Sequence, residues 1–176
     1  MASEPEDIGF ELCLMRHGIA VDRAAGGVLN DAERTLTPEG KERMQQIARG
    51  LAATGFTPDW VVSSPYLRAA ETGEIVAASC ARAAVPFDLC EALEPGGAVP
   101  GLLAFLARHS QRRRVLVVGH EPDLSEWAAS LTGAGRHANF GFKKGGCCLI
   151  CFEQSPPRPP GRLVWWLTPR VLRELA

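Results

Sequence analysis

The feature that most constrains this chain is a regular alternation of short apolar runs with longer segments of helical periodicity. Strand-like runs lie at 13–18, 59–65 and 112–120, and helical patterns lie at 37–55, 66–80, 97–109 and 121–133. Strands that alternate with helices pair mainly in parallel and need helices on both faces of the sheet. The pattern therefore predicts an α/β fold, a three-layer α/β/α architecture with a mainly parallel central sheet.

The helix expected at 37–55 carries signals at both of its ends. Thr37 supplies an N-cap side chain, Pro38 suits the first turn, and Gly55 suits the C-cap. These residues predict a helix that begins directly after the polar loop that follows the first strand.

The C-terminal part of the chain departs from the alternation. Two strand-like runs at 145–153 and 161–167 flank the turn-rich stretch at 155–161, which predicts a rigid hairpin connection rather than a linker. The 176 residues are enough for one hydrophobic core. We therefore expect a single domain over 1–176, with a flexible leader over 1–10.

Charge and composition exclude several classes of protein. The formal net charge of -1 argues against a general nucleic-acid binder, because such binding depends on excess positive charge. No apolar run approaches the roughly 18 residues of a membrane helix, and the acidic N-terminus differs from a signal peptide. The sequence predicts a cytoplasmic protein that binds neither nucleic acid nor membranes.

The six cysteines lie mostly inside apolar segments and lack regular spacing, as expected of small buried side chains in a reducing compartment. Cys148 and Cys151 form a CxxC pair, but this pair lies within a strand-like run and has no second pair to complete a zinc site. We therefore expect neither a metal site nor a cofactor.

Polar side chains gather where the predicted strands end. Arg16 and His17 close the first strand, Ser64 closes the second with Arg68 one turn into the following helix, and His120 closes the strand at 112–120. In an open α/β sheet the carboxyl ends of parallel strands meet at one edge, where ligands bind. Arg16, His17, Arg68 and His120 are therefore predicted to share one pocket.

This set of residue types indicates an anion site. Guanidinium groups match phosphate oxygens bidentately and stay charged at any working pH. A neutral imidazole is also a nucleophile, and neighbouring positive charge lowers its pKa. The predicted ligand is a phosphoryl group, and either ring nitrogen of His17 is open as the attacking atom.

The stretches LMRHG, SSPYLRAAET and VVGHEP, in that order, resemble the three signatures of the histidine phosphatase superfamily, the group related to phosphoglycerate mutases. The resemblance spans about residues 12–130. It implies a phosphoglycerate mutase-like fold and a metal-independent phosphatase. It also implies that His17 accepts the phosphoryl group, that Arg16 and Arg68 hold it, and that His120 is the second histidine of the pocket.

The short separations between these motifs resemble the small SixA-type phosphohistidine phosphatases. Arg34, Leu36, Thr37 and Gly40 in DAERTLTPEG are similar to the R-x-L-T-x-x-G element of that branch. Arg34 is a candidate for substrate binding, and so is Ser64, for which capping of the following helix is the alternative.

Relatives that act on phosphate esters use a carboxylic acid to protonate the leaving oxygen. Glu91 and Glu94 are the candidate acids here, although neither falls at a diagnostic spacing. A phosphohistidine substrate needs little such help, because imidazole is a good leaving group. This reasoning favours phosphohistidine in a partner protein as the substrate, with small phosphate esters as the first alternative and a non-catalytic phosphate-binding module as the second.

Overall fold

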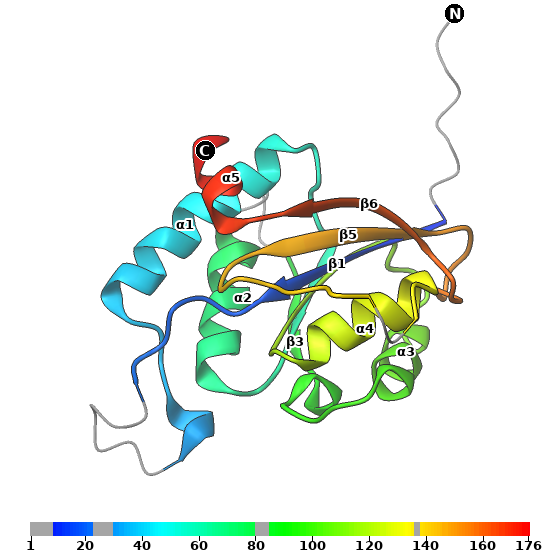
Figure 1. Ribbon diagram of the computed structural model, residues 1–176, viewed down its shortest axis with the longest axis horizontal. Coiled ribbons are helices and arrows are strands. Elements are labelled where there is room, and N and C mark those ends of the chain that lie inside the picture. The colour runs from blue at the N-terminus through cyan, green and yellow to red at the C-terminus, as the bar shows by residue number, and fades with distance from the viewer. Residues whose placement is uncertain (1–8, 23–29, 80–84, 136–137) are drawn as a thin grey trace, which may run out of the picture.

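The structure, a computed structural model, describes residues 9–22, 30–79, 85–135 and 138–176 (Figure 1). The strands in these residues are β1 (Phe10–Arg16), β2 (Trp60–Ser63), β3 (Phe87–Leu89), β4 (Arg114–Gly119), β5 (Cys147–Phe152) and β6 (Arg162–Leu167). They form one sheet in the order β3-β2-β4-β1-β5-β6.

The pairing of the strands confirms the predicted topology. The pairs β1 with β4, β2 with β4, and β2 with β3 are parallel. Strand β5 runs antiparallel to both β1 and β6, so the sheet ends in the expected hairpin. The result is a mainly parallel sheet whose parallel strands end at the same edge.

Helices cover both faces of the sheet and give the predicted three layers (Figure 1). They are α1 (Pro38–Ala53), α2 (Leu67–Ser79), α3 (Val99–Ala107), α4 (Asp123–Thr132) and α5 (Pro169–Glu174), with 3-10 turns η1 (Asp31–Glu33) and η2 (Glu91–Leu93).

Strand β1 divides its side chains between two apolar cores, as its period of two requires. Leu12 and Leu14 belong to the core that contains residues of α3 and α4. Cys13 and Met15 belong to the core that contains residues of α1, α2 and α5. Strand β1 therefore lies at the centre of the sheet, buried from Phe10 to Met15.

The predicted N-terminal signals of α1 act as expected, whereas the predicted C-cap at Gly55 is wrong by one residue. The Thr37 side chain accepts a hydrogen bond from the Gly40 amide at 2.9 Å, and Pro38 occupies the first helical position. Thr54 is the C-cap residue, and Gly55 follows it with a φ of 85°, a conformation that suits glycine.

The first turn of α1 lies against the chain that leaves β1. The Thr37 amide donates to the Ile19 carbonyl at 2.9 Å. A Cβ atom on Gly40 would lie 2.2 Å from the same carbonyl oxygen, so this approach requires a glycine. The contact fixes the path of the segment directly after β1.

Helix α5 is an element that the sequence analysis did not predict. Thr168 caps its N-terminus by accepting from the Val171 amide, and Pro169 occupies its first turn. It packs on α1 at Gly50, where a Cβ atom would lie 1.7 Å from the Leu172 carbonyl oxygen. The same Thr-Pro signal begins α1, but six residues are too few to show helical periodicity.

Of the leader expected at 1–10, residues 1–8 lie outside the described part of the chain. Phe10 already belongs to β1, where it is buried and pairs with Phe152. Cys80, the last residue of the helix expected at 66–80, also lies outside that part.

No helix in the described residues is long and apolar enough to cross a membrane. The five described cysteines form no disulfide with one another, and Cys148 lies within β5 as expected. Within the same ranges, no three side chains of the metal-binding types cluster.

Candidate active site

The ends of β1, β2 and β4 bring the predicted residues to one place. Arg16 is the last residue of β1 and pairs with Gly119, the last residue of β4. The His17 amide donates to the Gly119 carbonyl at 3.2 Å, so the strands end in register. His120 follows directly, and Arg68 reaches the same edge from the first turn of α2.

Arg68 connects the two histidines. Its Nε donates to Nε2 of His17 at 3.2 Å, and its Nη2 lies 3.4 Å from Nδ1 of His120. The two imidazole rings have centroids 5.2 Å apart. The side chains of His17, Arg68 and His120 are between 3% and 7% exposed, so they form a buried cluster.

The hydrogen bonds of His17 define its tautomer. The Gly18 carbonyl lies 2.7 Å from Nδ1 and can only accept, so Nδ1 carries the proton. Nε2 accepts from Arg68 and holds the lone pair that faces the cluster. The Gly18 amide in turn donates to the hydroxyl of Thr72 at 3.0 Å, and that hydroxyl donates to the Arg68 carbonyl at 2.6 Å.

Burial keeps both imidazoles neutral. Desolvation lowers the pKa of His17 to about 3; the Gly18 hydrogen bond opposes this change, while His120, Arg68 and Arg16 reinforce it. Desolvation also lowers the pKa of His120 to about 4, with Arg68 and Arg16 acting in the same direction and Asp31 against it. Both rings are therefore uncharged at neutral pH.

Ser64 holds His120 from the side opposite Arg68. Its hydroxyl lies 2.9 Å from Nε2 of His120 and also accepts from the Tyr66 amide at 3.3 Å. Because Arg68 can only donate to Nδ1, the neutral ring donates from Nε2 to Ser64. Ser64 has no exposed surface, and its contacts are those of a residue that orients His120.

Arg16 is fixed at one end of its guanidinium group. Its Nη1 donates to the Phe142 carbonyl at 2.7 Å. Its Nε is buried and has no hydrogen-bond partner among the described residues. Burial lowers the pKa of Arg16, and the nearby carboxylate of Glu121, which accepts from the Phe142 amide at 2.5 Å, opposes that change.

Arg34 reaches the cluster through a carboxylate. Its Nη1 forms an ion pair with Oδ1 of Asp31 at 3.0 Å, and its Nε donates to the Val21 carbonyl at 2.7 Å. The other oxygen of Asp31, Oδ2, lies 2.9 Å from Nη2 of Arg68. Arg34 is therefore connected to the histidines through two residues, Asp31 and Arg68.

Glu91 and Glu94 lie in and directly after η2. Neither makes a hydrogen bond or an ion pair with Arg16, His17, Arg68 or His120 in the described part of the structure. The carboxylate that does contact the cluster is that of Asp31.

Sequence reasoning did not single out Asp31, Thr72 or Glu121. Asp31 is the first residue of the DAERTLTPEG stretch, and a signal for it existed: a buried arginine requires a nearby anion. Thr72 acts through main-chain groups, which leave no recognisable pattern in the sequence.

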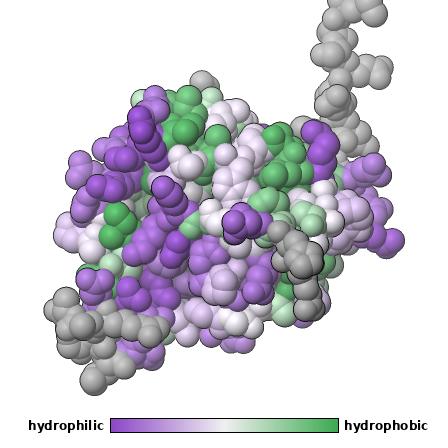
Figure 2. Space-filling model, viewed as in Figure 1, coloured by the Kyte–Doolittle hydropathy of each residue, from purple (hydrophilic) through white to green (hydrophobic). Residues whose placement is uncertain are grey.

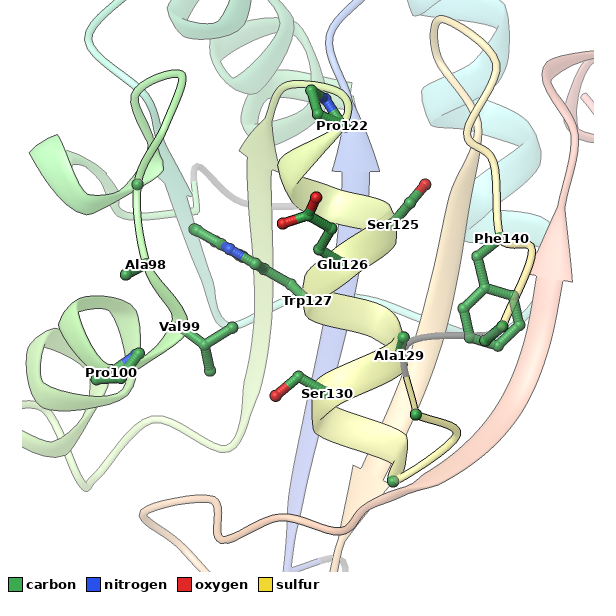
Figure 3. Close-up of a pocket in the computed structure, with 14 residues that line it drawn as sticks. Ala98, Val99, Pro100, Pro122, Ser125, Glu126, Trp127, Ala129, Ser130 and Phe140 are labelled. Atoms are coloured by element: carbon green, nitrogen blue, oxygen red, sulfur yellow. The ribbon is translucent and has the colours of Figure 1, made fainter.

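Hydrophilic residues gather on the face shown in Figure 2, around the chain that leaves β1. A separate groove of about 950 Å³ lies between α4 and the segment that enters α3 (Figure 3). Val99, Trp127 and Phe140 line this groove, whereas Arg16, His17, Arg68 and His120 do not.

Comparison with known proteins finds a family model and a relative that match this chain. Residues 12–94 match the model of the histidine phosphatase superfamily (branch 1). An uncharacterized protein of Picosynechococcus sp. is 37% identical over 141 residues, which cover 78% of this chain and 82% of that protein.

Two solved structures share the fold. The protein histidine phosphatase SixA complexed with tungstate has a TM-score of 0.77 and 26% identity, and the match covers 93% of this chain and 99% of that one. A putative phosphohistidine phosphatase SixA from Agrobacterium tumefaciens has a TM-score of 0.73 and 20% identity over 91% of this chain and 98% of its own.

Proposed function

The chain belongs to the histidine phosphatase superfamily, and from this premise we propose that it hydrolyses phosphohistidine in other proteins through a phosphorylated form of its own His17. Membership of the superfamily supports phosphatase activity. The substrate and the roles of the individual side chains are our proposals.

The observation that carries the proposal is the state of Nε2 of His17. The Gly18 carbonyl fixes the proton on Nδ1, so the lone pair of Nε2 points at the place where Arg68 and His120 converge. A pKa of about 3 keeps Nε2 unprotonated at neutral pH. A buried, neutral imidazole beside fixed positive charge is suited to attack a phosphorus atom.

The two arginines are suited to hold the phosphoryl oxygens. Arg16 presents a buried Nε that no described residue engages, and Arg68 directs Nε and Nη2 towards the two rings. Guanidinium groups stabilise the charge of the transferring phosphoryl group without taking part in proton transfer. His120, oriented by Ser64, completes the surroundings of that group.

The reaction has two in-line steps at one phosphorus atom. In the first, Nε2 of His17 forms a bond to phosphorus while the bond to the substrate imidazole breaks. The departing imidazole keeps the electron pair and takes a proton from solvent. In the second, water attacks phosphorus, the bond to His17 breaks, and orthophosphate and a proton are released.

The surroundings of the cluster favour a phosphoramidate over an ester. An alkoxide needs a proton donor as it leaves, and Glu91 and Glu94 form no hydrogen bond or ion pair with the cluster in the described structure. Both carboxylate oxygens of Asp31 already accept hydrogen bonds from guanidinium groups, Oδ1 from Arg34 and Oδ2 from Arg68. The 26% identity to a protein histidine phosphatase supports the same substrate. We place the reaction in the cytoplasm.

The test is an assay of the purified protein on a phosphohistidine protein, on sugar phosphates and on an aryl phosphate. We expect phosphohistidine to have the highest kcat/KM. His17→Asn should lower kcat by about 10³-fold or more, because the nucleophile is lost. After brief exposure to labelled substrate, the wild type should carry an acid-labile, base-stable label that His17→Asn lacks.

His109→Asn is the matched control, since His109 packs on Trp60 near the end of α3 and away from the cluster. It should keep activity within about 3-fold of the wild type. If esters were hydrolysed faster than phosphohistidine, the protein would be an ester phosphatase. Glu91 or Glu94 would then be the candidate proton donor to the leaving oxygen. Binding of orthophosphate without hydrolysis of any substrate would indicate a phosphate-binding module.

A further inference from the structure

We propose that Asp31 is a positioning residue that holds the guanidinium group of Arg68 between His17 and His120, and that Arg34 acts by holding Asp31. The proposal rests on the proposed function for its effect on catalysis. The part of the proposal that concerns geometry, that Asp31 fixes the position of the Arg68 guanidinium group, is testable without a substrate.

Asp31 engages the outer edge of the Arg68 guanidinium group with two acceptors. Nη1 of Arg68 donates to the Asp31 carbonyl at 2.7 Å, and Nη2 donates to Oδ2 of Asp31 at 2.9 Å. This leaves Nε directed at His17, with Nη2 shared with Nδ1 of His120. The plane of the guanidinium group is thus set from the side away from the histidines.

Charge supports the same role. Arg68 is 5% exposed, and a buried guanidinium group without a counter-ion is costly. Asp31 is the carboxylate that forms an ion pair with it in the described part of the chain. Burial lowers the pKa of Arg68, and the hydrogen bond and charge of Asp31 oppose that change.

Asp31 is itself held in place. Its Oδ1 receives Nη1 of Arg34, whose Nε is anchored to the Val21 carbonyl. The side chain of Asn30 caps η1 by accepting from the Ala32 amide at 3.1 Å. These contacts assign Arg34 to the support of Asp31 rather than to direct contact with a substrate.

The expected effect separates binding from turnover. The carboxylate of Asp31 repels a bound phosphate, so its removal favours substrate binding. The same removal also frees the Arg68 guanidinium group to move, which disfavours turnover. We expect Asp31→Asn to leave KM within about 3-fold and to lower kcat by about 10- to 100-fold, because small displacements in a transition-state contact cost that much. Asp22→Asn, which removes an exposed carboxylate from the chain that follows β1, is the control and should change neither constant.

A double-mutant cycle tests whether Asp31 acts through Arg68. Arg68→Lys keeps the charge but loses the planar fork. In that background, Asp31→Asn should change kcat by less than about 2-fold. If the two losses multiply in full, Asp31 acts independently of Arg68 and the proposal is wrong.

The NMR signal of the Arg68 Nε proton gives a readout without turnover, assigned by its loss in Arg68→Lys. We expect a slowly exchanging signal in the wild type, and faster exchange in Asp31→Asn at a temperature where both proteins are folded. An unchanged signal would overturn the proposal whether or not the protein hydrolyses phosphohistidine. Should Asp31→Asn fail to fold, Arg34→Gln is the second variant. It should raise the exchange rate of the same Arg68 Nε proton, by a smaller factor than Asp31→Asn.

Discussion

At the scale of single residues, the site depends on a neutral His17 and a neutral His120 in a buried place. Their lowered pKa values, about 3 and about 4, follow mainly from desolvation. The unfolded chain binds protons at these rings near pH 6.5, whereas the folded chain does not. The folded state therefore loses stability as the pH falls below about 6.5 towards 4.

This linkage gives a prediction for the free energy of unfolding. At pH 5 each histidine should cost about 1–2 kcal/mol of stability relative to pH 7.5. Urea unfolding of the wild type and of His17→Asn at the two pH values measures the difference, because the carboxylates titrate in both proteins. Equal losses of stability in the two proteins would show that His17 is not the group responsible.

At the scale of elements, two glycines set the distances at which neighbours pack on α1. A Cβ atom would lie 2.2 Å from the Ile19 carbonyl oxygen at Gly40, and 1.7 Å from the Leu172 carbonyl oxygen at Gly50. We expect Gly40→Ala and Gly50→Ala each to destabilise the fold by about 1–3 kcal/mol through overpacking. Thermal unfolding of both variants checks this.

The two variants should differ in activity. Gly40 contacts the chain that leaves β1 two residues after His17, whereas Gly50 contacts α5. Gly40→Ala should therefore lower kcat by about 10-fold or more, and Gly50→Ala should leave it within about 2-fold. Equal activities at a temperature where both are folded would show that this contact does not position His17.

The same elements show what the sequence could predict. The start of α1 followed from Thr37 and Pro38, and Gly55 marked its end to within one residue, because caps are local signals. The sequence also predicted which side chains lie close together, because they occur at or just after the ends of parallel strands: Arg16, His17, Arg68 and His120. Helix α5 and the turn η1 were not predicted because both are too short to show helical periodicity. Asp31, the carboxylate that contacts Arg68, lies in η1 and was missed for the same reason.

At the scale of the whole molecule, positive charge gathers around one buried place in a chain of nearly zero net charge. Arg16 and Arg68 would repel a divalent cation, and no group of three metal-binding side chains occurs in the described ranges. We expect dialysis against a chelator to leave kcat and KM within about 2-fold of their initial values. A loss that one added metal ion restores would contradict this prediction.

The central position of β1 also has a consequence for synthesis of the chain. Residues 10–16 leave the ribosome well before their two neighbours in the sheet, β4 and β5, which end at residues 119 and 152. Contacts so distant in sequence form slowly, and the apolar strand must wait for them. A growing chain therefore cannot complete the centre of its sheet until residue 152 has been made, and its apolar strand β1 lacks a partner on one side until then.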